Sequence, residues 1–206
     1  MPMRIRDSTI ELGVRDERVA PGDHVAYFWD TRPDFVRGIA FLERGLRGED
    51  HGVIFGHEDA NAEVLQVLRE HGLDPDVLAA EGRLSVLGSA ATGDAMLANI
   101  GEVFERAVAR GAPLIRLLGN IGWGRPGWPG EEDILAFEAK VTGAARAFPC
   151  VVLCMYDVQA LPGRVMVHGA YETHPLTICG NVLRENPYYV GVDTFLARMS
   201  ATEKTE

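Results

Sequence analysis

Segments that read as apolar strands alternate with amphipathic helical segments along nearly the whole of this chain. Strand patterns occupy residues 24–29, 52–55, 84–87, 114–118, 150–156 and 176–179. Helical patterns occupy residues 35–46, 60–71, 75–81, 94–110, 131–148, 163–171 and 192–199. The strand CVVLCMY is apolar at almost every position, as parallel strands covered on both faces are. The alternation predicts an α/β fold of three layers, with a doubly wound, mainly parallel sheet between two layers of helices.

The chain is organised as one domain over residues 1–206. Its hydrophobic content of 47% is enough for a sizeable single core. We expect an extended arm at residues 1–22 that ends at a Pro-Gly pair, a compact domain at 23–199 and a frayed tail at 200–206.

The charge balance excludes several classes of partner. The formal net charge is −10 and no basic cluster is present, which argues against binding nucleic acid or an anionic membrane surface. No apolar run approaches the ~20 residues of a membrane span. The three cysteines are an odd number and lie in apolar segments, so we expect reduced thiols and a cytoplasmic protein.

The first strand–turn–helix unit lacks the parts that bind a nucleotide. A phosphate-binding loop needs glycines and a lysine at this turn, but the turn here reads DTRPD at residues 30–34. The only lysines are Lys140 and Lys204, and neither follows a glycine. The fourth strand ends LIRLLGN, without the carboxylate that would hold Mg²⁺. We therefore expect no nucleotide and no cofactor.

Parallel sheets place ligands at the carboxyl ends of their strands. Here the residues at or just after those ends include Trp29, Asp30, Arg32, His57, Glu58, Ser89, Asn120, Tyr156 and Asp157. Aromatic and polar side chains in this mixture are typical of a small-molecule pocket. The same residues are also what strand ends exposed to solvent contain, and Asp157 has the further alternative of capping the turn that follows it.

Two candidates lie inside strands. His24 starts the first strand, at the opposite end from the expected pocket, and is interpreted either as a hydrogen-bonded structural histidine or as a functional residue. Cys154 lies within the fifth strand, where it is either a small buried hydrophobe or a reactive thiol. Arg116 lies in the fourth strand, and a buried guanidinium needs a partner; we expect Glu138 or Asp157, with binding of an anionic ligand as the alternative.

The loop GNIGWGRPGWPG carries two tryptophans, Trp123 and Trp128. Large aromatics on a loop rich in glycine and proline indicate a lid over an apolar ligand, and packing against the core is the alternative. No histidine or cysteine spacing fits a metal site; His168, His174 and Cys179 could converge only through folding, and we expect no metal. The chain also lacks a G-x-S-x-G nucleophile elbow.

Across residues 20–190 the chain resembles the MEDS domain, the sensory domain of methanogen and methylotroph signalling proteins. The resemblance rests on the order of GDHVAYFWD, FLERGLRGED, IRLLGNIGWG, LCMYD, THPLTI and ENPYYV. That family is similar in turn to KaiC-type, RecA-like ATPase domains but lacks their phosphate loop. The positions matching its pattern include His24, Gly45, Arg116, Trp123, Glu138, Cys154, Tyr156, Asp157 and His174.

The resemblance implies a sensory domain for a small organic molecule, built on a catalytically inactive RecA-like core. Many members carry a DNA-binding or kinase module that this chain lacks, so we expect its output to pass to a kinase or transcription regulator on another chain. An enzyme using His57, Glu58, Tyr156 or Asp157 as acid–base groups and a ligand-free protein-binding scaffold are the alternatives; a homo-oligomer is left open. The predicted ligand-binding residues are His24, Trp29, Asp30, Arg32, Arg116, Trp123, Cys154, Tyr156, Asp157 and His174.

The missing phosphate loop yields a first prediction. Millimolar ATP with Mg²⁺ should leave the melting temperature of the protein unchanged, because a ligand that binds the native state must stabilise it by mass action. Differential scanning fluorimetry measures this directly. A saturable rise of several degrees would show that another part of the chain binds the nucleotide.

Overall fold

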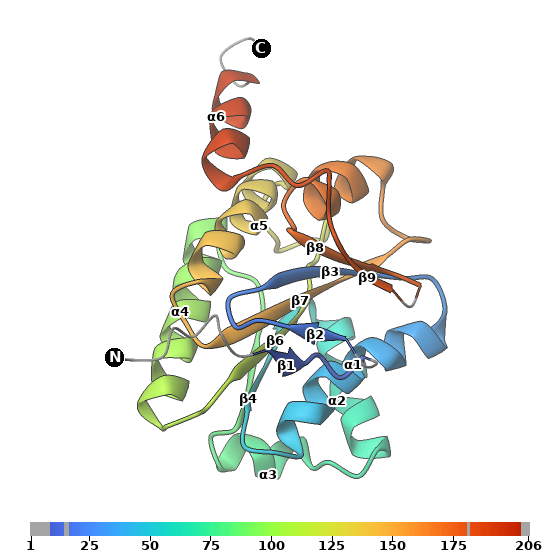
Figure 1. Ribbon diagram of the computed structural model, residues 1–206, viewed down its shortest axis with the longest axis vertical. Coiled ribbons are helices and arrows are strands. Elements are labelled where there is room, and N and C mark those ends of the chain that lie inside the picture. The colour runs from blue at the N-terminus through green and yellow to red at the C-terminus, as the bar shows by residue number, and fades with distance from the viewer. Residues whose placement is uncertain (1–8, 15–16, 181, 203–206) are drawn as a thin grey trace.

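The computed structural model describes residues 9–14, 17–180 and 182–202, and its centre is a seven-stranded sheet (Figure 1). The strand order is β5-β4-β6-β7-β3-β8-β9, and all neighbours are parallel except the antiparallel pair β8 and β9. The strands are β3 (His24–Trp29), β4 (His51–Gly56), β5 (Leu84–Leu87), β6 (Ile115–Asn120), β7 (Cys150–Asp157), β8 (Leu176–Cys179) and β9 (Val182–Glu185). The predicted α/β class and mainly parallel sheet are confirmed.

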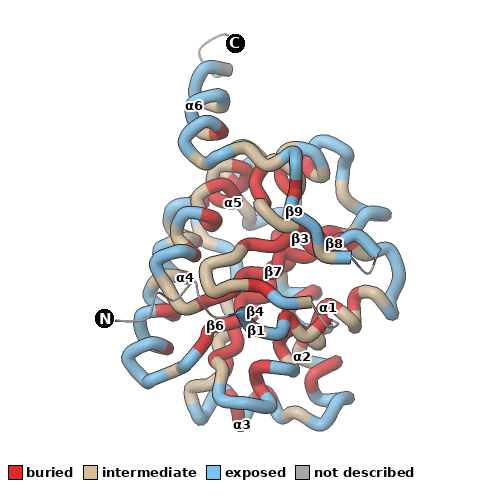
Figure 2. Tube along the Cα trace, in the orientation of Figure 1, coloured by how far each residue is buried: buried red, intermediate tan, exposed pale blue. Residues whose placement is uncertain are grey.

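Helices cover both faces of the sheet, and an apolar core lies on each side of it. On one face lie α4 (Gly93–Ala109) and α5 (Glu131–Ala145); on the other lie α1 (Arg32–Leu46), α2 (Glu58–Glu70) and α3 (Pro75–Ala80). Alternate residues of the central strands β3, β4, β6 and β7 enter opposite cores, and these strands are buried almost throughout (Figure 2). The π-helix η2 (Val165–Tyr171) precedes β8, and α6 (Val192–Thr202) extends from the fold beside α5 (Figure 1).

The bounds of β3, β5 and β8 are those predicted from the sequence. Strand β9 was missed because it is a short edge strand with the sequence VLRE, whose apolar content is too low to mark it. Helix α6 continues three residues past its predicted end, into the predicted tail; residues 203–206 of that tail lie outside the described chain. No helix in the described ranges is long and apolar enough to span a bilayer.

Helix α1 begins inside the turn predicted at residues 30–34. Thr31 is its N-cap, and the Thr31 side chain accepts a hydrogen bond from the Asp34 amide. Pro33 occupies the first turn, where its missing N–H is not needed. The Asp34 carboxylate also lies in this turn and accepts from the Thr31 hydroxyl, a bond that lowers the pKa of Asp34. The helix therefore carries its own anionic group at the end where a phosphate-binding helix receives its ligand.

The N-terminal arm is held to the domain by Arg116. Its described residues form two short antiparallel strands, β1 (Ile10–Glu11) and β2 (Arg18–Val19). The buried Arg116 guanidinium donates to the carbonyl oxygens of Leu12 at 2.8 Å and Glu11 at 3.1 Å, and to the Asp50 carboxylate at 2.7 Å. The Arg116 guanidinium is thus bonded within the protein, and its contacts with the arm are to backbone carbonyl oxygens.

The predicted partners of Arg116 were wrong. Ile115 and Leu117 of β6 enter the core under α4 and α5, so Arg116 between them points to the opposite face, towards α1. Glu138 belongs to α5 and is on the other side of the sheet. The acid that Arg116 reaches is Asp50, just before β4.

The close approach of Arg116 to α1 depends on Gly45. A Cβ atom at Gly45 would lie 2.6 Å from Arg116 Cδ, well inside van der Waals contact. We expect Gly45→Ala to lower the free energy of unfolding by about 1–3 kcal/mol, the range for overpacking a well-packed site. Chemical denaturation measures the change.

Gly101→Ala is the matched control, since Gly101 lies in helix α4 and a Cβ atom added there would have no neighbour within 4 Å. That replacement should stabilise the protein by about 0.4–1 kcal/mol. Equal effects of the two substitutions would show that the Arg116 side chain is not held against α1.

Candidate functional site

A pocket of about 410 Å³ lies at the carboxyl ends of β3, β6 and β7, where a parallel sheet is expected to bind ligands. Its volume is within the range of small-molecule sites. Its walls also include α2 and the loop of residues 121–130. The lining residues are Trp29, Phe35, His57, Asp59, Ala60, Glu63, Asn120, Ile121, Trp123, Arg125, Met155, Asp157, Ala160 and Leu161. We call this the strand-end pocket.

Two residues that line the strand-end pocket each carry a buried hydrogen-bond donor that has no partner among the described residues. The indole Nε1 of Trp29 and the amide Nδ2 of Asn120 are both buried and unpaired within the described part of the chain. Trp29 packs edge-on against Phe35, with ring centroids 5.0 Å apart, which fixes the direction of its N–H. Buried donors normally find an acceptor, so this pair marks a place where an acceptor atom is favoured.

The loop of residues 121–130 closes one side of the strand-end pocket. Trp123 lines the pocket and also packs on Gly169 of η2, where a Cβ atom would lie 3.0 Å from its ring. Arg125 ties the loop to α2 through Asp59, at 2.8 Å. Trp128 instead packs edge-on against Phe55 and lines a separate pocket of about 640 Å³. The two tryptophans expected to act together therefore have different environments.

The remaining strand-end residues divide between the pocket and its surroundings. Asp157 lines the pocket, and its Oδ1 also accepts from the amides of Gln159 and Ala160, as in the turn-capping alternative. Asp30 and Arg32 are exposed and do not line the pocket; Arg32 pairs with Glu63 beside it.

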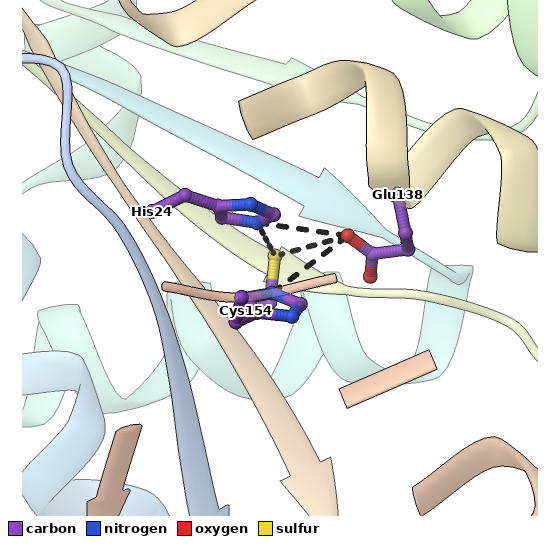
Figure 3. Close-up of side chains that lie close together, drawn as sticks. His24, Glu138 and Cys154 are labelled. Carbon is purple, nitrogen blue, oxygen red and sulfur yellow. Dashed lines mark hydrogen bonds and ion pairs between the residues drawn. The ribbon is translucent and has the colours of Figure 1, made fainter. Parts of the chain in front are cut away.

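Four other predicted residues meet elsewhere, around Glu138 of α5. His24 from β3, Cys154 and Tyr156 from β7, and His174 just before β8 surround its carboxyl group. Figure 3 shows His24, Cys154 and Glu138 pointing towards one another. We call these five residues the buried polar cluster. All of them are less than 5% exposed.

Short distances join the members of the buried polar cluster. His24 Nε2 lies 3.3 Å from Cys154 Sγ and 3.6 Å from Glu138 Oε2. Cys154 Sγ and His174 Nε2 are each 3.8 Å from Glu138 Oε2. The Tyr156 hydroxyl lies 2.8 Å from the other carboxyl oxygen, Oε1. The side chains therefore converge on one small volume from four segments of the chain.

Burial keeps the cluster uncharged near neutral pH. Desolvation raises the pKa of Glu138 to about 8 and raises the pKa of the Cys154 thiol well above its usual range. The same effect lowers the pKa of His174 to about 3 and lowers that of His24, with His174 adding to the shift. Four protonatable groups are thus held neutral by the same low-dielectric surroundings.

Four of the five members of the buried polar cluster were singled out from the sequence, but the sequence did not predict that their side chains lie together. His24 was expected far from the other candidates, and Tyr156 was expected beside Trp29. In the sheet, Phe28 pairs with Tyr156 and Trp29 with Asp157, so Tyr156 and Trp29 face opposite sides. Glu138 was considered only as a partner of Arg116. The one available signal was that His24, Glu138, Cys154 and His174 all match the family pattern.

The fold is therefore an α/β domain with a mostly parallel seven-stranded sheet flanked by helices and a pocket at the strand ends. The chain belongs to the MEDS family, the MEthanogen/methylotroph, DcmR Sensory domain, whose family profile matches residues 23–175. The chain is also similar to the transcriptional repressor DcmR of Methylorubrum extorquens (strain DSM 6343 / CIP 106787 / DM4), with 25% identity over 170 residues. That match covers 78% of this chain and 63% of the repressor, so the chain spans less than two thirds of its relative's length.

The Tyr156 hydroxyl provides a test of the buried polar cluster. It contacts Glu138 Oε1 and the Gly169 carbonyl oxygen, 2.9 Å away, so Tyr156→Phe removes both contacts. We expect a loss of about 1–3 kcal/mol in the free energy of unfolding, the scale for leaving buried polar groups unpaired. Tyr188→Phe is the control, because Tyr188 is 67% exposed, and should change it by less than about 0.5 kcal/mol. A Tyr156→Phe protein as stable as the wild type would contradict these contacts.

Proposed function

We propose that this chain is a sensory domain that binds a small, largely apolar molecule carrying one hydrogen-bond acceptor in the strand-end pocket. The observation that carries the proposal is the pair of unpaired donors, Trp29 Nε1–H and Asn120 Nδ2–H, on two residues that line that pocket. Membership of a sensory family and similarity to a transcriptional repressor support the regulatory role.

The walls of the pocket suit such a ligand. Trp29, Phe35 and Trp123 offer aromatic surface, and Ile121, Met155 and Leu161 add aliphatic surface. Apolar contact supplies affinity in proportion to the area removed from water. One acceptor atom on the ligand, such as an alcohol oxygen, a carbonyl oxygen or a halogen, would satisfy a donor that otherwise stays buried without a partner.

The loop of residues 121–130 is the element proposed to report binding. Its link to α2, between Arg125 and Asp59, joins two side chains that are 47% and 79% exposed, and exposed pairs of this kind hold weakly. Trp123 contacts both the pocket and η2. A ligand that packs against Trp123 favours the closed loop, which shifts the population that a partner protein meets.

The proposed scaffold is a RecA-like core without nucleotide chemistry, and the proposed partner is a kinase or transcription regulator on another chain. Asp34 supplies a carboxylate at the start of α1, where nucleotide phosphate would need the same space and the opposite charge. The structure favours the enzyme alternative less, because two of its proposed acid–base residues have other roles. Tyr156 belongs to the buried polar cluster, and His57 caps α2 by accepting a hydrogen bond from the Ala60 amide.

Calorimetric titration of a ligand panel tests the proposal. Short alcohols, ketones and halogenated alkanes should include at least one compound that binds saturably, whereas protonated amines, which offer only donors, should bind worse. Trp29→Phe keeps the ring and removes the N–H, and Asn120→Ala removes the amide. Each should weaken binding about three- to tenfold, the factor for one net hydrogen bond.

Trp128→Phe is the matched control, because Trp128 lines the neighbouring pocket and not this one. It should leave the affinity unchanged. If no compound binds, or if Trp128→Phe weakens binding as much as Trp29→Phe, the strand-end pocket is not the sensing site.

A further inference from the structure

The buried polar cluster has the geometry of a metal site. Nε2 of His24, Nε2 of His174, Sγ of Cys154 and Oε2 of Glu138 all lie within 4.8 Å of one another. The closest separations are 3.3, 3.6, 3.8 and 3.8 Å. Ligand atoms bound tetrahedrally to Zn²⁺ at 2.0–2.3 Å are separated by about 3.3–3.8 Å. Four of the six separations therefore match a zinc-sized tetrahedron, and the other two lie within 4.8 Å.

The hydrogen bonds around the cluster leave a lone pair on each inward-facing histidine nitrogen. The Thr142 hydroxyl donates its proton to the Thr173 carbonyl oxygen, so at 2.8 Å from His24 Nδ1 it accepts from that nitrogen. His24 Nδ1 therefore carries the proton and Nε2 carries the lone pair.

The position of the proton on His174 follows from the same argument. Its Nδ1 lies 2.9 Å from the Ala170 carbonyl oxygen, which can only accept, so Nδ1 is protonated and Nε2 is not. Nε2 is fully buried and has no hydrogen-bond partner in the described ranges. Metal-binding histidines are held in this way, with the outer nitrogen donating to a carbonyl or hydroxyl oxygen and the inner lone pair facing the ion.

We propose that His24, Glu138, Cys154 and His174 form a closed, tetrahedral site for a divalent transition metal ion of the zinc type. Two imidazoles, one thiolate and one carboxylate are ligands that Zn²⁺ accepts. On binding, the thiol and carboxyl protons leave to solvent and two metal–ligand bonds replace them. The ion's two positive charges are balanced by the thiolate and the carboxylate, so the filled site is neutral, as deep burial requires.

Neighbouring groups are placed to support the ligands. The Tyr156 hydroxyl reaches Glu138 Oε1, the carboxyl oxygen that does not face the other three ligand atoms, and would orient the carboxylate. His174 follows η2, and π-helical turns are frequent at functional sites. Four protein ligands without an open position are the mark of a structural rather than a catalytic ion. The ion would join β3, α5, β7 and the segment leading into β8.

Metal content and a spectroscopic probe test this site. The untagged full chain, purified from cells grown with added Zn²⁺, should contain about one equivalent of zinc per chain by mass spectrometry. Chain produced with Co²⁺ should show thiolate-to-cobalt charge transfer in the near ultraviolet and the visible bands of tetrahedral cobalt. Wild-type chain with neither metal nor these bands would overturn the proposal, whatever any variant does.

Matched variants assign the ligands. Cys154→Ser should abolish the thiolate charge-transfer band, whereas Cys150→Ser, at a buried cysteine four residues away on the same strand, should preserve it. His174→Gln should lower the metal content at least tenfold, and His51→Gln should not, because His51 is a buried histidine bonded to Gly82 and Ser85. A band that survives Cys154→Ser, or that Cys150→Ser removes, would place the metal elsewhere.

Discussion

The carboxyl group of Glu138 is the constraint around which one half of this molecule is arranged. It has no exposed surface, and among the described residues only His24 and His174 lie within ion-pair distance of it. An ionised carboxylate without a cation is unfavourable in such surroundings. The surrounding segments supply a thiol, a hydroxyl group and two imidazoles that burial keeps neutral, and these groups tolerate the neutral form of the carboxyl group.

The alternation of strand residues separates this chemistry from a buried charge. Arg116 is a buried cation and Glu138 carries a buried carboxyl group, and the sheet lies between them. Each group has partners on its own side of the sheet. Arg116 bonds to Asp50 and to backbone carbonyl oxygens, and Glu138 lies among the other members of the buried polar cluster. The strand-end pocket shares no lining residue with the buried polar cluster, but it adjoins the cluster at Gly169, which packs on Trp123 and whose carbonyl oxygen contacts the Tyr156 hydroxyl.

The sequence alone predicted the features of the fold that depend on local residue patterns. The apolar runs of β3, β5 and β8 and the amphipathic helices follow from periodicity, and the general rule for parallel sheets led to the pocket at Trp29, Trp123 and Asp157. Contacts between residues far apart in the chain could not be predicted from the sequence. His24 and Cys154 are 130 positions apart, and only the register of β3 against β7 shows that their side chains meet. Arg116 failed for the same reason, because alternation alone does not show which helices cover its face of β6.

The contacts between Arg116 and the N-terminal arm have a consequence for which sequence changes the arm can accept. The guanidinium recognises carbonyl oxygens of Glu11 and Leu12, and every amino acid offers the same carbonyl. These bonds do not depend on the side chains at positions 11 and 12, although the Glu11 carboxylate also pairs with Arg44 and the Leu12 side chain is buried in the core. A change at position 11 can therefore remove the pair with Arg44 while the arm keeps its backbone contacts with Arg116.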